Sequence, residues 1–547
     1  MSSRDAFFPD RQFADARIRT ALILIVPSLY LIATLLYSSQ MAVWGRQVDP
    51  ESAYTMNGLV AAAGYGSMKY DHPGTTTTLL VELIVRVWAF VARAPDIVEF
   101  GLRHYDAITH AARTSEALVL TASLATGGLI VARATGSAIA AMLFQAGPLV
   151  HADTFHFEMV LIPESLMVSI AMLGLALVIK AALDEEPPSA GLGALSGLMF
   201  ALGFSTKYLY LPLAALGVCL LRSPRALKWA SVVGAGAFVG LNLAFNPGTI
   251  TRGFGWLTSI ATHKGRYGEG EAGFVDLAEF WSNMGEIVTA APLVFAIFLA
   301  GGLAGLIACI RRRSWSDPVS LTLIAAFLVY GAQLAATSKH FALHYMMASW
   351  VLAGGVLVLL IVQIRRLVPA IPATALAAVA GAMCVVMAGQ TFAQIRREAL
   401  QWSAWDAAGA RLSQAVAEAG PACANVSAMF VHAPENDMNH GFDMTLQPWG
   451  DQQKRERFSE AYGRAFAVPL LDHGFYTRVL KKNFRPTTYA KLAAEYPCIV
   501  LRINETLDAA SGIGLLDLNP DHCAIAGIQV YTVGIACAKI EAAYARK

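Results

Sequence analysis

The run TALILIVPSLYLIATLLY, from Thr20 to Tyr37, decides the fold because it is mostly apolar and carries no charged side chain. A helix needs about 20 such residues to cross a hydrocarbon core of roughly 30 Å. Arginines precede the run, the nearest being Arg17 and Arg19. The run is longer than the core of a signal peptide, which holds about 7–15 apolar residues. We therefore expect an uncleaved first membrane helix whose basic flank, with the N-terminus, stays in the cytoplasm.

Apolar blocks of similar length recur along most of the chain. Of its 547 residues, 56% are hydrophobic and 15% are charged, whereas soluble proteins carry about 25% charged residues. The net charge of +2 argues against a nucleic-acid partner. The composition predicts an α-helical polytopic membrane protein and excludes a soluble multidomain enzyme, a disordered protein and a coiled coil. Further spans are expected around Leu120, Leu143, Ile170, Leu198, Ala214, Val239, Ile297, Phe327, Leu357 and Ala378.

One apolar block, Thr75 to Ala94, contains Glu82, Arg86 and Arg93. Each charge at the centre of a span costs about 2.5–3.5 kcal/mol on insertion scales. Leaving this block out gives about 11 spans and places three basic clusters in the cytoplasm, as the positive-inside rule requires. We therefore expect an interfacial or re-entrant helix within a long first outer loop, residues 40–113. The three clusters are Arg222/Arg225/Lys228, Arg311/Arg312/Arg313 and Arg365/Arg366.

The composition changes near residue 395. Short β-prone runs, such as Cys498–Ile503 and Ile528–Val533, alternate there with helix-like stretches. This predicts a C-terminal soluble α/β domain over residues 395–547, on the outer face, after a transmembrane catalytic domain over residues 1–394. An oxidising compartment would join its cysteines in two disulfides, with three possible pairings. These cysteines are Cys423, Cys498, Cys523 and Cys537.

Familiar soluble signatures are missing from the chain, which has no GxxxxGK[ST], GxGxxG, HExxH or GxSxG motif. Nucleotide hydrolysis and dinucleotide chemistry therefore have no support. Acids and cations gather instead at the outer ends of the expected spans. A cavity with acids on one wall and cations on another would suit a lipid-linked phosphate leaving group and a hydroxyl nucleophile. The acids are Asp49, Glu51, Asp153 and Glu164, and the cations are Lys207, Lys264, Arg266 and Lys339.

Each motif also has an ordinary structural interpretation. Asp49 and Glu51 suit general-base work, or are solvated loop acids. The stretch with Lys69, Asp71 and His72 precedes a helix whose N-terminus is a ready phosphate site, or it only caps that helix.

The remaining motifs are equally two-sided. The motif that contains Asp153 and Glu164 lines the cavity, or Glu164 only complements a helix dipole. Lys207 binds an anion or snorkels to the interface. The glycine-hinged loop with His263, Lys264 and Arg266 is a clamp on phosphate or sugar, or merely a flexible loop. The group at the start of span ten lines the cavity or anchors an aromatic belt, and it comprises Lys339, His344 and Tyr345.

The order of these motifs resembles the GT-C glycosyltransferases, close to the protein O-mannosyltransferase and aminoarabinose-transferase branch, over roughly residues 20–390. Asp49-Pro-Glu51-Ser-Ala-Tyr54 is similar to the family's acidic motif after span one, although a proline separates acids that are usually adjacent. Asp71-His72-Pro73-Gly74 is similar to its His-Pro-Pro-Leu element, and Gly203-Phe-Ser-Thr206-Lys207 to its Gly-Leu-x-x-Thr-Lys segment. Arg113, Arg133 and Glu164 also fall where the family pattern has them.

The resemblance implies a GT-C fold and an enzyme. The family moves a sugar from a polyprenyl-phosphate carrier to an acceptor outside the membrane, by inverting displacement. Carried over, Asp49 or Glu51 would be the general base, Glu164 would shape the same cavity, and Lys207 would lie near the carrier phosphate. Charge alone makes His263, Lys264 and Arg266 donor contacts.

These expectations have consequences for partners and location. The acceptor would be a lipid, glycan or protein, and membrane lipid would be a partner but nucleic acid would not. No cofactor is certain, and a divalent metal stays open. We expect a bacterial inner-membrane protein whose active site and C-terminal domain are periplasmic. The alternatives are a transporter or flippase for a lipid-linked sugar, and a ligase that uses a diphosphate donor.

Overall fold

The computed structural model describes residues 16–42, 51–67, 74–265, 270–427, 452–463, 467–472, 475–482, 485–503 and 514–546, with single residues between 431 and 445. The chain divides into two compact units. Unit 1 comprises residues 1–38, 69–77 and 113–396, and unit 2 comprises residues 39–68, 78–112 and 397–547. The first outer loop expected from the sequence is therefore divided, and most of it belongs to the same unit as the C-terminal residues.

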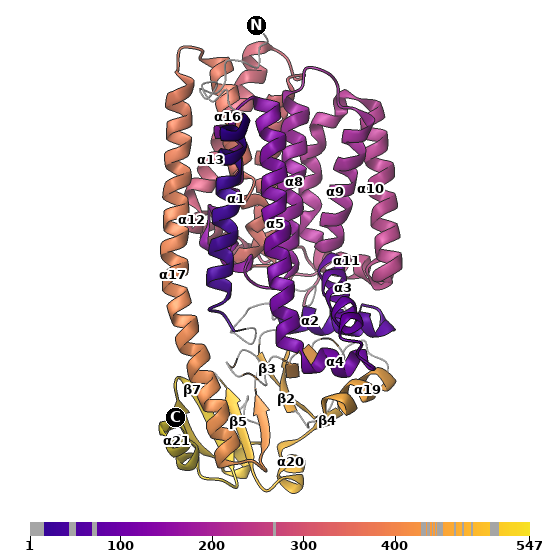
Figure 1. Cartoon of the computed structure of the whole chain (residues 1–547), viewed down its shortest axis with the longest axis vertical. Helices are drawn as coiled ribbons and strands as arrows, with labels where there is room; N and C mark the ends of the chain where they lie inside the picture. Colours follow the sequence, from indigo (N-terminus) through magenta and orange to yellow (C-terminus); the bar gives the residue numbers. More distant parts are fainter. Residues whose placement is uncertain are drawn as a thin grey trace. The chain divides into compact units, whose positions relative to one another are not determined.

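Unit 1 is a bundle of apolar helices (Figure 1). Within the described residues, eight helices are long and apolar enough to cross a membrane, and α9 (Ala190–Thr206) and the 3₁₀ helix η5 (Tyr208–Arg222) are shorter apolar helices. This confirms the polytopic helical class. Seven of the eight are α1 (Ala16–Ser38), α5 (Tyr105–Thr135), α8 (Pro163–Leu183), α10 (Pro224–Phe245), α13 (Pro292–Arg312), α14 (Pro318–Lys339) and α17 (Ala373–Ala419). The eighth is the segment Leu343–Leu367, which includes the 3₁₀ turn η7 (Leu343–Met346), α15 (Met347–Trp350) and α16 (Ala353–Leu367).

The apolar block near Leu143 forms no single long helix. It is divided into α6 (Ala138–Gln145), the 3₁₀ turn η4 (Gly147–Leu149) and α7 (Ala152–Phe157). Pro148 lacks an N–H donor and ends regular helix there. Gly147 lies so close to a neighbouring carbonyl oxygen that a Cβ would come within 2.1 Å of it. The expected span is thus a broken, mostly buried segment.

The ambiguous block is helical but is not one of the eight candidate spans. It forms α3 (Thr75–Val91), in which Arg86 pairs with Glu82 at 2.8 Å. The apolar side chain of Phe90 is 84% exposed, whereas Val81 and Val85 are fully buried. The helix therefore has one packed face and one open apolar face, and its position at a membrane interface stays a prediction.

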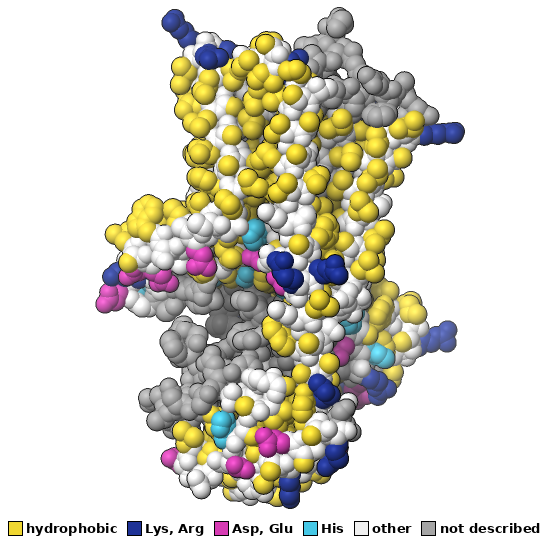
Figure 2. Space-filling view, turned by 90° about the vertical axis from the view of Figure 1, so that its left-hand side faces the viewer, with side chains coloured by type: hydrophobic (Ala, Val, Ile, Leu, Met, Phe, Trp, Pro, Cys, Tyr) yellow, Lys and Arg dark blue, Asp and Glu magenta, His cyan; other side chains and the backbone are white. Residues whose placement is uncertain are grey.

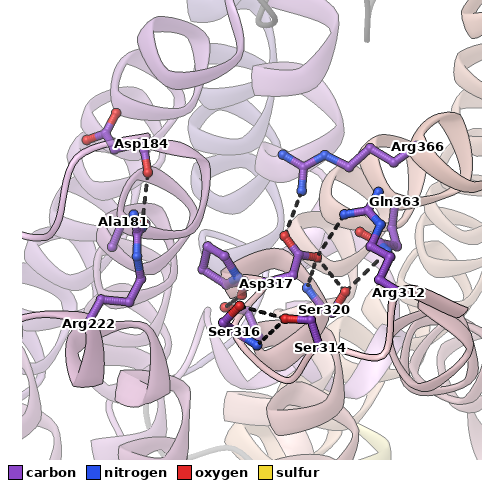
Figure 3. A network of polar contacts seen from close by, with 12 residues as sticks. Ala181, Asp184, Arg222, Arg312, Ser314, Ser316, Asp317, Ser320, Gln363 and Arg366 are labelled. Atoms are coloured by element: carbon purple, nitrogen blue, oxygen red, sulfur yellow. Dashed lines mark hydrogen bonds and ion pairs between the residues drawn. The ribbon is translucent and has the colours of Figure 1, made fainter. Parts of the chain in front are cut away.

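One end of unit 1 gathers the basic clusters (Figure 3). Arg222 donates a hydrogen bond to the backbone carbonyl of Asp184 at 3.0 Å. Asp317 pairs with Arg366 at 3.1 Å and with Arg312 at 4.0 Å. We call the end of unit 1 that carries these basic clusters the arginine end. The three clusters thus share one end, as the charge argument requires, and the placement of that end in the cytoplasm stays a prediction.

The sides of the unit 1 helices are apolar where they face outward (Figure 2). Leu36 on α1 is 61% exposed and Val385 on α17 is 72% exposed. A soluble protein rarely exposes a continuous apolar surface of this kind. The surface fits contact with lipid along the helices.

Unit 2 combines short helices with a seven-stranded sheet of order β4-β3-β2-β1-β5-β7-β6. Strand β1 pairs in parallel with β2 and β5, and the other neighbours are antiparallel. The strands are β1 (Ala424–Ser427), β2 (Ala467–Asp472), β3 (Phe475–Lys482), β4 (Arg485–Thr487), β5 (Ile499–Ile503), β6 (Asp521–Ile525) and β7 (Ile528–Val533). The helices, besides α3 and parts of α5 and α17, are α2 (Glu51–Val60), the π-helix η3 (Ala61–Tyr65), α4 (Ile97–Arg103), α19 (Gln452–Tyr462), α20 (Tyr489–Glu495), the 3₁₀ turn η8 (Leu516–Leu518) and α21 (Cys537–Ala545).

The sheet shares a core with the end of α17, α20 and α21. Leu412 and Ile540 from two of these helices are buried in one cluster with Leu501 and Val530 from the central strands. This confirms the predicted C-terminal α/β fold. Two disulfides close it, as predicted, and the structure selects the pairing Cys423–Cys498 and Cys523–Cys537.

Candidate active site

A buried ion pair lies at the end of unit 1 opposite the arginine end. Glu164 is in the first turn of α8, directly after Pro163, and Lys207 is the residue that ends α9. The Lys207 ammonium donates to Glu164 Oε1, and His344 Nε2 lies 3.7 Å from the same oxygen. The three side chains are 0–3% exposed. Since α8 has 21 residues that rise about 1.5 Å each, roughly 30 Å separates this site end from the arginine end.

An aromatic ring lies against the lysine. The Lys207 Nζ lies 4.1 Å from the centroid of the Tyr345 ring, a distance at which the ring attracts a cation. The His340 ring stacks on the Tyr345 ring, with 5.1 Å between their centroids. Gln333 donates to the Tyr345 carbonyl at 2.9 Å. The lysine is therefore held between a carboxylate and a fixed ring.

The second carboxylate oxygen of Glu164 takes no part in the ion pair. Among the described residues, Glu164 Oε2 has no hydrogen-bond partner although the side chain is fully buried. Buried polar atoms are nearly always satisfied by protein, water or ligand. A ligand hydroxyl or a water at this oxygen would complete its hydrogen bonding.

A polar network joins the start of α3 to the end of α9, beside Lys207. The Gly74 N–H donates to the Thr206 carbonyl at 2.9 Å, and the hydroxyls of Thr76 and Thr206 lie 2.6 Å apart. Thr75 donates to Asn242 on α10 at 2.8 Å, and Asn242 in turn donates to a serine hydroxyl of α9 at 2.8 Å. The network brings the segment after the His-Pro element next to the Thr-Lys segment.

An apolar cavity of about 510 Å³ opens between α8, α9, η5 and α10. This volume is within the roughly 300–1,000 Å³ of ordinary ligand pockets. Phe204 and Tyr210 line it, and they lie three residues before and after Lys207. Gly203 permits this arrangement, because a Cβ there would come within 2.6 Å of the Tyr210 ring. Two of the residues that line the cavity are therefore close to the buried lysine in the sequence.

The other predicted cations do not converge on Glu164 in the described contacts. Lys339 donates to the backbone carbonyls of Ile260, His263 and Phe274. Lys264 pairs with Glu271 at 3.0 Å, largely exposed. Of the predicted wall residues, the described contacts join Glu164 and Lys207 directly, and the arrangement of two facing walls stays a prediction.

Within the described residues, no hydrogen bond or ion pair joins Asp153 to Glu164 or Lys207. His151 caps α7 by accepting from the Asp153 N–H at 3.2 Å, and their side chains approach to 3.9 Å. Both side chains are partly exposed. Asp153 thus lies in the first turn of α7, and its role in a cavity stays a prediction.

Two further predicted residues belong to unit 2. Glu51 opens α2 and is 1% exposed, and Tyr54 lies buried on the same helix. A carboxylate in a first helical turn is stabilised by the helix dipole. Tyr105 donates to the Ser52 carbonyl at 2.5 Å and fixes this turn. Asp49, Lys69, Asp71, His72 and Arg266 lie outside the described residues.

Glu158 is a buried acid that the sequence alone did not mark as a candidate. Tyr30 on α1 donates to Glu158 Oε2 at 3.2 Å, and the acid is 2% exposed. Burial raises the pKa of the Glu158 carboxyl well above its usual range, although the Tyr30 hydrogen bond opposes the shift. The signal in the sequence was an acid followed at once by Met-Val-Leu-Ile.

In the described part of the chain, no group of three or more His, Cys, Asp or Glu side chains could hold a metal ion.

No protein-family model and no curated protein sequence matches this chain. Among solved structures, it is similar to ArnT from Cupriavidus metallidurans bound to undecaprenyl phosphate, with 13% identity and a TM-score of 0.46 over 93% of this chain and 98% of the other. The apo state of that protein gives 14% identity and a TM-score of 0.47 over the same shares. The oligosaccharyltransferase AglB from Archaeoglobus fulgidus, in complex with an inhibitory peptide and a dolichol-phosphate, gives 11% and 0.40 over 81% of this chain and 69% of the other.

Proposed function

We propose that this chain is an integral membrane glycosyltransferase that takes a sugar from a polyprenyl-phosphate carrier and transfers it to an acceptor hydroxyl or amine. The observation that carries the proposal is the buried lysine Lys207, held by Glu164 at the end of an apolar bundle. A lysine without an exposed route to bulk water is costly to keep. A buried lysine has a use that offsets this cost where the protein must bind an anionic headgroup next to lipid.

In the proposed reaction a carboxylate, Asp49 or Glu51, takes the proton from the acceptor. The acceptor atom attacks the anomeric carbon of the sugar from the face opposite the phosphate. The bond between that carbon and the phosphate oxygen breaks, and the phosphate leaves with the electron pair. Lys207 stabilises the charge that develops on the leaving phosphate, and such electrostatic stabilisation is usually the largest single term in catalysis.

Glu164 has a positioning role in this scheme. It orients Lys207 and balances its charge while no phosphate is present, because a buried charge without a partner is costly. Its second oxygen, Oε2, has no partner among the described residues and would accept a sugar hydroxyl. His344, close to the same carboxylate, limits how far Glu164 can move when the phosphate arrives.

The carrier tail has a place in the apolar cavity between α8, α9, η5 and α10. Its lining consists mostly of rings and small apolar residues, with the hydroxyls of Ser196, Tyr210 and Ser231 among them, and such a lining suits an isoprenoid chain. Phe204 and Tyr210 connect it with the Lys207 region. A tail in this cavity would set the phosphate at the lysine.

We further propose the sidedness and domain roles. With the arginine end in the cytoplasm, the site end faces the periplasm of a bacterial inner membrane. Residues 1–394 would form the catalytic domain, and residues 395–547 would position the acceptor. His263, Lys264 and Arg266 would contact the donor phosphate from the segment before α12 (Leu277–Ala290).

The test is sugar transfer from a synthetic polyprenyl-phosphate sugar by the purified protein. Glu51→Gln and Asp49→Asn are compared with Glu99→Gln, a control acid that is exposed in unit 2. We expect one of the first two to lose at least about 100-fold in rate, the usual contribution of a general base, and the control to keep the wild-type rate. Wild-type transfer by both would overturn the base assignment. Movement of the lipid-linked sugar across liposomes without transfer would establish a flippase instead.

A further inference from the structure

Helix α12 (Leu277–Ala290) has three different faces. One face is packed, with Ile287 fully buried. A second face is apolar but open, with Leu277 67% and Trp281 62% exposed. The third face is acidic and exposed, with Glu279 and Glu286. A helix that simply covers the bundle would need only the first and third faces.

The open apolar face continues at the start of the helix. Phe274, two residues before the capping Asp276, is 64% exposed. Positions 277, 281, 284 and 288 fall on one side of a helix with 3.6 residues per turn, and they are Leu, Trp, Met and Val. The acids at 279 and 286 fall on another side. This separation is typical of a helix that lies in a membrane interface.

The depth of α12 along the bundle is fixed by three connections in unit 1. Only Ala291 separates it from α13, which begins at Pro292 on the site end. Asn283 donates to the carbonyl of Ser338, in the last turn of α14, at 2.9 Å. The Lys339 ammonium, at the end of α14, binds the Phe274 carbonyl. The helix therefore lies level with the ends of the candidate spans.

We propose that α12 is an interfacial anchor whose open apolar face, formed by Phe274, Leu277 and Trp281, inserts into the lipid leaflet at the site end. The acids on its other exposed face point to water. The occupant of the apolar face is lipid, because the face is level with the ends of the apolar spans and α13, which begins one residue after α12, exposes Leu293 in its first turn. This inference does not depend on the reaction proposed above.

The anchor also explains the three-carbonyl contact of Lys339. The Lys339 ammonium binds the carbonyls of His263 and Phe274, close to the bridge that pairs His263 with Ala272. Since α12 begins a few residues after this bridge, lipid contact on α12 and the Lys339 contacts would together hold the bridge at the membrane surface.

The test is nitroxide accessibility in vesicles of phosphatidylcholine and phosphatidylglycerol that contain the full-length protein. Single labels are attached at Leu277→Cys, Trp281→Cys, Glu279→Cys and Glu286→Cys, each on the same helix. The background signal from label attached to native cysteines is measured with the wild-type chain. Its free cysteines in unit 1 are buried, and they are Cys219, Cys309 and Cys384. Relaxation by oxygen reports lipid, and relaxation by a water-soluble nickel chelate reports water.

We expect oxygen accessibility to exceed nickel accessibility several-fold at 277 and 281, and the reverse at 279 and 286. Nickel accessibility at all four positions would overturn the proposal, because the helix would lie in water. Oxygen accessibility at all four would also overturn it, because the helix would be immersed. A label at Val385→Cys on α17, 72% exposed, calibrates the lipid signal, and each variant is first shown to elute as the wild type does.

Discussion

The two ends of unit 1 treat charge in opposite ways. At the arginine end, Asp317 is shared by Arg312 and Arg366, and these side chains remain 15–40% exposed. At the site end, Glu164 and Lys207 are at most 1% exposed. Exposed pairs contribute about 0–1 kcal/mol, whereas a buried pair recovers its desolvation cost only with very good geometry. Under the proposed function, the charges at the first end would set the orientation in the membrane, and the pair at the second end would be kept at a cost to stability because it binds the carrier phosphate.

The largest effect should come from breaking the buried pair. Lys207→Met leaves the Glu164 carboxylate buried without its cation, and we expect a loss of about 3–5 kcal/mol in unfolding free energy. The double variant Glu164→Gln/Lys207→Met should regain most of that loss, because no uncompensated charge remains. Denaturant unfolding in detergent measures both. An unchanged stability in the single variant would mean that the pair is not desolvated.

A second buried acid at the site end, Glu158, accepts a hydrogen bond from Tyr30 rather than from a lysine, and it should make the stability depend on pH. The folded pKa of Glu158 is raised above the unfolded value, so its stabilising contribution is complete below about pH 4.5 and is lost as the pH rises toward the folded pKa. In that window the wild type should lose up to about 1.4 kcal/mol per pH unit relative to Glu158→Gln. Unfolding at pH 5 and pH 8 measures the difference. Parallel pH profiles for the two proteins would contradict the raised pKa.

The ring beside the lysine should have a smaller effect. Tyr345→Leu removes the cation–π contact with Lys207 and should weaken the site by about 0.5–2 kcal/mol. Tyr345→Phe keeps the ring face and serves as the matched control. The concentration of polyprenyl-phosphate sugar that gives half-maximal transfer should rise for the first variant only. Equal shifts in both would point to the hydroxyl rather than the ring.

At the arginine end the effect should be smallest. Arg366→Gln removes one arm of a partly exposed pair, and Arg312 remains beside Asp317. We expect a loss of at most about 1 kcal/mol and a wild-type transfer rate. Unfolding and transfer assays on this variant check both. A large loss of transfer would show that the two ends are coupled.

The sequence predicted single residues better than their partners. Apolar blocks located most helices because span length and composition are local properties. Glu164 and Lys207 were both identified as candidates, yet their direct pairing was not, because it depends on how α8 packs against α9. The same holds for Asn242, an ordinary polar residue in an apolar helix until its contact with Thr75 is known.

Other differences also have physical causes. The Leu143 block has the composition of a span, but Gly147-Pro148 and close packing against a neighbouring carbonyl divide it. The even count of C-terminal cysteines predicted two disulfides, whereas the pairing required the strand order. Lys339 was expected to face the cavity, and it is instead used by backbone carbonyls that no sequence pattern reveals.

The most direct test of the central claim is single-turnover sugar transfer by two matched lysine variants. The first is Glu164→Gln/Lys207→Met, which removes the buried pair without leaving an unpaired charge. The control is Lys180→Met, at the other end of α8, where the lysine pairs with Asp184 and is 46% exposed. We predict that the first loses transfer from a polyprenyl-phosphate sugar by at least about 100-fold, the usual effect of removing a transition-state charge contact, while the control transfers at the wild-type rate. Wild-type transfer by the folded first variant would contradict a phosphate-binding role for Lys207.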